Sequence, residues 1–204
     1  MNDRLPEIAA ALRRAARRYG TPVAVTDVRE LVAAATLVRG AFPDPWLRAY
    51  SVKANDVAAI VARVAGLGFD ANVVSRGEWA VATRAGIAND RVTIEGVGKT
   101  DADLWAAVRA ARAGKPPRWL AIESAAEASA LVRIAAAGIG DGSLDVLFRL
   151  NPDVAPETLR GLAVGAGASK FGMTADELTA AVEVVAAGRG LVPRGIHLHV
   201  GSQL

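Results

Sequence analysis

A single lysine follows a short apolar stretch in the segment Tyr50–Asn55, which reads Tyr-Ser-Val-Lys-Ala-Asn. Lysine is scarce here, because only four of the 24 basic residues are lysines. An amine held partly out of water at a strand end loses its proton more readily than an exposed amine, and it can then form a Schiff base with an aldehyde. The alternative for Lys53 is a lysine at the rim that only reaches water.

Both histidines of the chain, His197 and His199, lie two residues apart in a predicted strand, so their side chains share one face. Two imidazoles without a third ligand nearby make a poor metal site, and we expect no metal. Gly201 and Ser202 follow directly, where backbone N–H groups and a hydroxyl could hold a phosphate. These groups, with the amine of Lys53, suit a phosphorylated aldehyde cofactor. A histidine satisfied in the core is the alternative for either imidazole.

Short apolar strands alternate with amphipathic helices, and this alternation predicts how the chemical groups are positioned. Ser75 to Glu78 has the spacing of a capping box, and we expect Asn55 to cap the helix after Lys53. The pattern predicts six strands. The first leads to Lys53, and the other five lie near residues 71–74, 92–95, 119–122, 146–150 and 195–200.

The start of the chain has a different pattern. Apolar residues at helical spacing predict a first helix that ends at Gly20, then a strand at Val23–Val25, then a helix capped by Thr26 or Asp27. We therefore divide the chain into a helix-strand-helix segment at residues 1–45 and a barrel portion at residues 46–204.

Strands that alternate with helices must pair in parallel, so the fold class is α/β with a parallel sheet. An open doubly wound sheet and a (β/α)8 barrel both satisfy this pattern. No G-x-G-x-x-G fingerprint follows the first strands, because Gly96-Val97-Gly98 lacks the third glycine. A closed barrel needs eight strands and usually ~250 residues, so six strands in 204 residues predict an incomplete one.

Composition limits the partners. The chain is 52% hydrophobic with a formal charge of only +3, which favours a globular protein without a nucleic-acid partner. It has no cysteine, which excludes disulfides and fits a reducing compartment. Its apolar runs are shorter than the ~18 residues of a membrane span, and charged residues occupy the place of a signal peptide. We therefore expect a cytoplasmic protein that contacts no membrane.

Seven motifs together carry a family resemblance. In chain order they are Tyr50–Asn55, Asn72–Glu78, Gly96–Lys99, Glu123-Ser124, Arg149–Asp153, Ser169–Gly172 and Gly195–Gln203. In this order the chain resembles the diaminopimelate decarboxylases, members of the alanine-racemase-like (fold type III) class of pyridoxal phosphate (PLP) enzymes. The resemblance implies a (β/α)8 TIM-type barrel, of which this chain holds about six strands. It also implies that the N-terminal helix and strand pack on a C-terminal β-domain beyond residue 204.

The resemblance also implies roles for single residues. Lys53 would form the Schiff base with PLP, and His199 would stack on the cofactor ring. Ser202, with Gly201, would contact the phosphate, and Arg149 would lie near the cofactor.

Asn72 departs from the family, which usually has aspartate beside the lysine. A neutral amide there removes a negative charge near the Schiff base and could alter substrate preference. The Ser75 match could be only a helix cap, so it is left out of the predicted site.

The implied activity is PLP-dependent decarboxylation of an amino acid, from meso-diaminopimelate to lysine, in a cytoplasmic homodimer. In the family, the acidic partner of the ring nitrogen and a cysteine-containing segment from the second subunit lie beyond the position of Leu204. We therefore expect an N-terminal fragment with little activity alone. The alternatives are a decarboxylase for ornithine, arginine or a specialised amino acid, a racemase-like barrel, and a non-catalytic PLP-binding relative.

Overall fold

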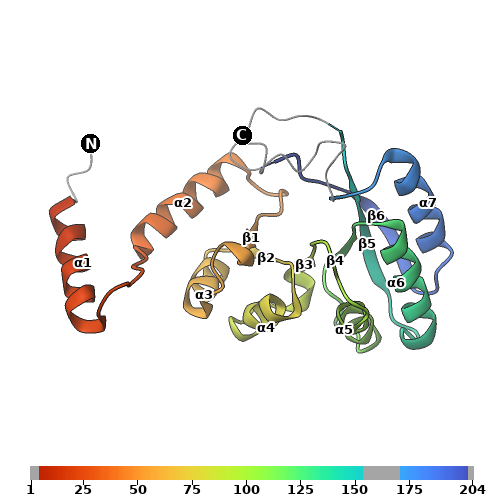
Figure 1. The fold of residues 1–204 in the computed structure, drawn as a ribbon, viewed down its shortest axis with the longest axis horizontal. Coiled ribbons are helices and arrows are strands. Elements are labelled where there is room, and N and C mark those ends of the chain that lie inside the picture. Colours follow the sequence, from red (N-terminus) through yellow and green to blue (C-terminus); the bar gives the residue numbers. More distant parts are fainter. Residues whose placement is uncertain (1–4, 154–170, 202–204) are drawn as a thin grey trace. The chain divides into compact units, whose positions relative to one another are not determined.

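The computed structural model describes residues 5–153 and 171–201. The chain forms two compact units, Met1–Pro43 and Asp44–Leu204. Figure 1 traces both along the sequence. The larger unit carries the whole of the described sheet, and the predicted chemical groups belong to it.

The larger unit is built around one parallel sheet of six strands. The strands are β1 (Ala49–Ser51), β2 (Asp70–Val73), β3 (Val92–Ile94), β4 (Trp119–Ile122), β5 (Leu144–Leu150) and β6 (Leu191–Leu198). Each strand pairs with the next one along the chain, in the order β1 to β6. A doubly wound sheet would reverse this order at a switch point, so the arrangement is that of an incomplete (β/α)8 barrel, as predicted.

Five α-helices cover one face of this sheet (Figure 1). They are α3 (Ala58–Gly66), α4 (Arg76–Arg84), α5 (Asp101–Arg112), α6 (Ala125–Gly138) and α7 (Ala175–Ala186), with short 3-10 turns η1 (Val52–Ala54) and η2 (Asn89–Arg91). The core between sheet and helices includes the fully buried side chains of Val73, Leu104, Leu120, Ile122, Leu131, Ile134, Val146 and Phe148. Burial of these apolar side chains fixes the strands against the helices.

The starts of α4, α5 and α7 follow the predicted positions, with one difference in detail at α4. Thr100 and Thr174 close reciprocal capping boxes at α5 and α7. The predicted box at Ser75 is wrong, because Glu78 reaches past the cap and accepts the N–H of Val74 at 3.0 Å. The serine hydroxyl still accepts the Glu78 N–H, so α4 begins where expected.

The local structure around Lys53 also differs from the prediction. Strand β1 ends at Ser51, and Lys53 lies in the turn η1 that follows it. Asn55 ends this turn, and its Oδ1 accepts the N–H of Val57 at 3.0 Å, so Val57 rather than Asn55 is the N-cap of α3. An asparagine that bonds the backbone two residues ahead forms a turn of its own, and this inserts one extra bend before the helix.

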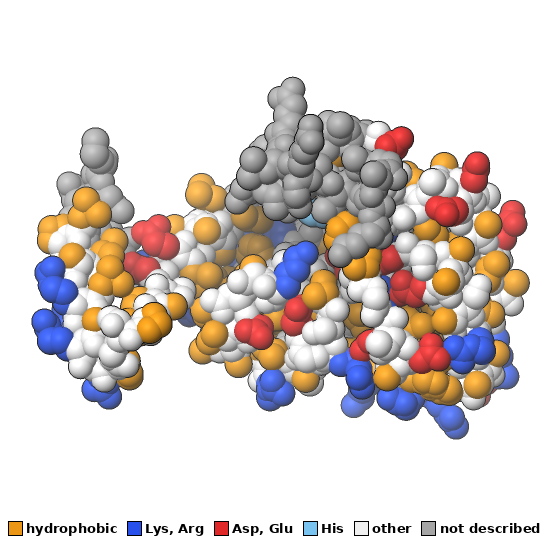
Figure 2. Space-filling model, viewed as in Figure 1, with side chains coloured by type: hydrophobic (Ala, Val, Ile, Leu, Met, Phe, Trp, Pro, Cys, Tyr) orange, Lys and Arg blue, Asp and Glu red, His pale blue; other side chains and the backbone are white. Residues whose placement is uncertain are grey.

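The smaller unit contains α1 (Leu5–Tyr19) and α2 (Val28–Ala41). Asp27 caps α2, as predicted, and Arg29 joins the two helices through a 3.0 Å ion pair with Glu7. On α1, hydrophobic side chains lie along one side and basic ones along the other (Figure 2).

One predicted element of the smaller unit is wrong. Val23–Val25 forms no strand, because a strand needs a hydrogen-bonded neighbour and the described chain provides none there. None of the helices in the described residues is long and apolar enough to cross a membrane.

Candidate active site

A pocket of about 640 Å³ opens at the carboxyl ends of the strands. It is lined by Ser51, Lys53, Asn72, Val74, Glu95, Gly96, Val97, Arg149, Phe171, His197 and His199. Four residues predicted from the sequence are therefore brought together: Lys53, Asn72, Arg149 and His199. Gly201 is not among the described lining residues, and Ser202 lies outside the residues that the structure describes.

Strand register explains why these side chains converge. Ser51 lies beside Asn72 across β1 and β2, and Arg149 lies beside His197 across β5 and β6. Because residues opposite each other in a parallel sheet project from the same face, each pair enters the pocket together. Lys53 lies in the turn η1 directly after β1, and His199 lies directly after β6; both also line the pocket.

Arg149 is held firmly within the pocket wall. Its Nη1 donates to both carboxylate oxygens of Glu123, at 2.9 and 2.8 Å. Its Cζ lies 4.8 Å from the centroid of the Phe171 ring, where the guanidinium is attracted by the aromatic face. Both charged side chains are buried, and the ion pair fixes the guanidinium in the pocket wall.

The two imidazoles are kept neutral by their surroundings. Burial lowers the pKa of His199, and the nearby positive charges of Arg149 and Lys53 lower it further. Burial also lowers the pKa of His197, although Glu95, whose Oε2 lies 3.5 Å from His197 Nε2, opposes this effect. An imidazole with its ordinary pKa of about 6.5 is already mostly uncharged at pH 7, and a lowered pKa increases the uncharged fraction of both rings.

Two features of the site differ from the sequence prediction or were missed. Lys53 is exposed, so the expected removal of its amine from water is not seen; the described sheet has no pairing between β1 and β6. Glu95 and Glu123 were not assigned to the site. Each directly follows a buried parallel strand, and that position alone predicts a side chain at the strand-end edge.

The fold and pocket define an incomplete α/β-barrel domain with a pocket of small-molecule size at the carboxyl ends of its strands. A family model described as "Pyridoxal-dependent decarboxylase, pyridoxal binding domain" matches residues 28–204. The chain belongs to this family.

Curated relatives agree with this assignment. The chain is 37% identical over 204 residues to a diaminopimelate decarboxylase of Zymomonas mobilis, covering 98% of this chain and 45% of the relative. It is 35% identical over 188 residues to the Archaeoglobus fulgidus enzyme of the same name, covering 92% and 43%. The chain thus spans less than half the length of the curated relatives it matches.

Solved structures agree as well. The diaminopimelate decarboxylase of Helicobacter pylori, complexed with L-lysine, superposes with a TM-score of 0.76 at 28% identity, over 85% of this chain and 43% of that one. The M. jannaschii enzyme, also with L-lysine, gives a TM-score of 0.76 at 26% identity, over 94% of this chain and 44% of that one.

Proposed function

We propose that this chain is the cofactor-binding portion of a PLP-dependent amino-acid decarboxylase that converts meso-diaminopimelate to lysine. Its family and relatives support this reaction. The observation that carries the proposal is the convergence of an amine, an imidazole and a buried guanidinium, from Lys53, His199 and Arg149, on one pocket. Because the chain spans less than half the length of these relatives, the activity is proposed for the full-length protein.

The pocket fits the cofactor in size and in the groups it offers. Its volume of about 640 Å³ lies within the usual range for small-molecule sites. The exposed amine of Lys53 is free of the buried ion pairs below it and can reach an aldehyde at the mouth. When bound, PLP would supply an electron sink for the bond that releases CO2.

The residues of this chain would divide the remaining tasks. Lys53 Nζ would hold the aldehyde and carry a proton at that atom when the substrate amine takes its place. The neutral ring of His199 would lie against the cofactor ring. Arg149 would hold an anionic group, and the amide of Asn72 would contribute hydrogen bonds without charge. Gly201 and Ser202 would hold the phosphate.

The wider setting is part of the same proposal. We assign residues 46–204 to the PLP-binding barrel and residues 1–45 to a segment that packs on a further β-domain. We also propose that the full-length protein works as a homodimer in the cytoplasm. Sedimentation of the full-length protein, in which a monomer would contradict the dimer, tests the assembly.

Trapping the cofactor on the protein tests the site. Purified full-length protein is titrated with PLP, the absorbance band at the edge of the visible range is recorded, and borohydride then fixes the adduct for mass spectrometry. We expect the label on Lys53 and its loss in Lys53→Ala. Lys115→Ala is the matched control, because Lys115 is exposed but lies outside the pocket. Equal labelling of Lys115, or no band at all, would contradict the proposal.

Release of CO2 tests the substrate. The full-length protein is supplied separately with meso-diaminopimelate, ornithine, lysine and arginine. We expect the largest kcat/KM with meso-diaminopimelate. A larger value for any other amino acid would replace the proposed substrate, while the trapping experiment would still stand.

A further inference from the structure

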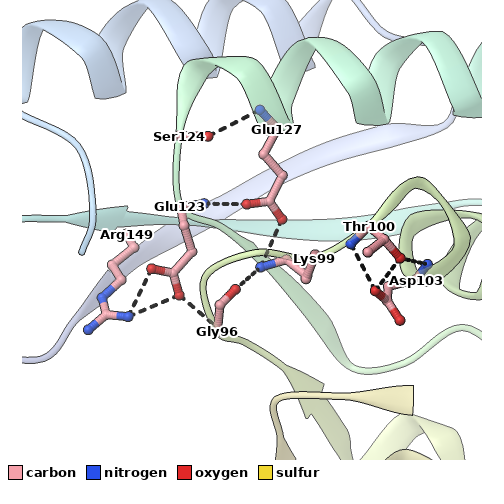
Figure 3. Close-up of polar contacts among 8 residues, drawn as sticks. All are labelled: Gly96, Lys99, Thr100, Asp103, Glu123, Ser124, Glu127 and Arg149. Atoms are coloured by element: carbon pink, nitrogen blue, oxygen red, sulfur yellow. Dashed lines mark hydrogen bonds and ion pairs between the residues drawn. The ribbon is translucent and has the colours of Figure 1, made fainter. Parts of the chain in front are cut away.

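Figure 3 shows two buried ion pairs, one of which includes the pocket-lining Arg149. Lys99 Nζ lies 2.8 Å from Glu127 Oε1, with the two side chains 2% and 10% exposed. Arg149 and Glu123 are 2.8 Å apart at 7% and 3% exposure. Charges are seldom buried this deeply, because removing them from water is expensive. Such a cluster calls for a reason beyond stability.

The contacts of Lys99 close a ring (Figure 3). Its ammonium donates to the carbonyl of Gly96 and pairs with Oε1 of Glu127. Oε2 of Glu127 accepts the backbone N–H of Glu123 at 3.1 Å. Oε1 of Glu123 then accepts the N–H of Gly96 at 3.0 Å, which returns the ring to its start.

Gly96 is the point where this ring reaches the pocket wall. Its φ of +96° favours glycine, and a Cβ added there would lie 3.0 Å from Cβ of Val74. The N–H of Gly96 donates to the buried carboxylate of Glu123, and the carbonyl of Gly96 accepts from the buried ammonium of Lys99. The wall at Gly96 is therefore oriented by polar contacts from two sides.

The ring is linked to Arg149 through a shared atom. Oε1 of Glu123 accepts from Gly96 N–H and from Arg149 Nη1, at 3.0 and 2.9 Å. A rotation of this carboxylate would therefore move the guanidinium and the wall together. Lys99, although it does not line the pocket, acts on both through Glu127 and Gly96.

We propose that Lys99 is a positioning residue for the PLP pocket, which it serves by locking the Gly96 wall and the Glu123–Arg149 pair into one arrangement. The inference rests on the proposed function, because it takes PLP as the pocket's ligand. Lys99 touches neither cofactor nor substrate. Its effect is on binding geometry, and small displacements of a positioning group cost affinity and rate.

The test separates positioning from stability. In Lys99→Met/Glu127→Gln both buried charges are replaced together, and such replacement is often neutral for stability. We expect full-length protein with this pair of changes to unfold near the wild-type temperature but to bind PLP about tenfold more weakly in a titration of the visible band. The control Arg133→Met removes an ion pair to Asp101 whose side chains are about 60% exposed, and both measurements should stay unchanged.

A second variant covers the case in which the double variant fails to fold. Gly96→Ala displaces the same wall without changing a charge, and we expect a similar weakening of PLP binding. Wild-type affinity in the folded double variant, or in Gly96→Ala when the double variant does not fold, would overturn the role of Lys99. The role of Lys99 would also be overturned if the double variant lost no more affinity for PLP than the control Arg133→Met. Failure of the wild-type protein to bind PLP would instead overturn the proposed function.

Discussion

Helices α4 and α6 begin in the same way, yet only one start takes part in the buried ring. In each, a serine hydroxyl accepts the N–H of a glutamate three residues later at 3.2 Å, from Ser75 to Glu78 and from Ser124 to Glu127. In each, the glutamate carboxylate reaches back to the N–H of the residue before the serine. The capping geometry is therefore the same at both sites.

The residues around the two caps make the difference. The residue before the α4 cap is Val74, whereas the residue before the α6 cap is Glu123, which reaches Gly96 and Arg149. In the described structure only the α6 glutamate, Glu127, pairs with a buried lysine. A cap motif thus fixes where a helix starts. The residue just before the cap decides whether that helix start also contacts the residues of the pocket.

Among these variants, Lys99→Met should cause the largest loss in the free energy of unfolding. It leaves the carboxylate of Glu127 buried without its counter-ion, and removing one partner of a buried pair costs about 3–5 kcal/mol. Denaturant unfolding at neutral pH measures the loss. A loss under about 1 kcal/mol would mean that the buried ion pair at the start of α6 adds no more stability than an ordinary helix cap such as that of α4.

The same variant should show a pH dependence. Burial raises the pKa of Glu127, and Lys99 partly opposes this, so its removal raises the pKa further. A carboxyl whose pKa is higher in the folded than in the unfolded state binds more protons when folded, so stability falls as pH rises through the folded pKa. We therefore expect the deficit of Lys99→Met to shrink on acidification from neutral pH, relative to wild type at each pH. A deficit that grows in acid would contradict this sign.

The serine caps should be equivalent. Ser75→Ala and Ser124→Ala each remove one hydroxyl acceptor of the same length and should each cost about 1 kcal/mol. Thermal unfolding of the two variants side by side checks this. If Ser124→Ala costs several times more than Ser75→Ala, the cap itself would carry the difference that we assign to Glu123 and Lys99.

The smallest effect should come from the exposed side of α6. Arg133 pairs with Asp101 at 2.7 Å, but both side chains are more than half exposed. Arg133→Met should therefore change the free energy of unfolding by no more than about 0.5 kcal/mol. A larger loss would show that the buried ring is not what distinguishes α6.

The sequence predicts the elements of the barrel better than their junctions. Apolar alternation locates all six strands, because each strand must be buried between neighbours and a helix layer. It fails at Val23–Val25, where no strand lies alongside, and at Asn55, where a local side-chain bond competes with the helix cap. Both wrong predictions depend on hydrogen-bond partners, and the spacing of apolar residues carries no information about those partners.

The site residues also fall into a group that the sequence predicts and a group that it does not. Lys53, Asn72, Arg149 and His199 are found by motif, and the pocket unites them. The roles of Glu123 and Lys99 were missed, because their contacts with Arg149 and Glu127 join residues 26 and 28 positions apart in the sequence. Only the register of neighbouring strands brings such residues together.

The closed ring also constrains how this protein can vary. Replacing Lys99 leaves the charge of Glu127 buried without a partner, and replacing Glu127 does the same to Lys99. Tolerated substitutions at these two positions should therefore occur together. In a randomised library selected for function, positions 99 and 127 should covary although 28 residues separate them, while position 96 should admit little besides glycine.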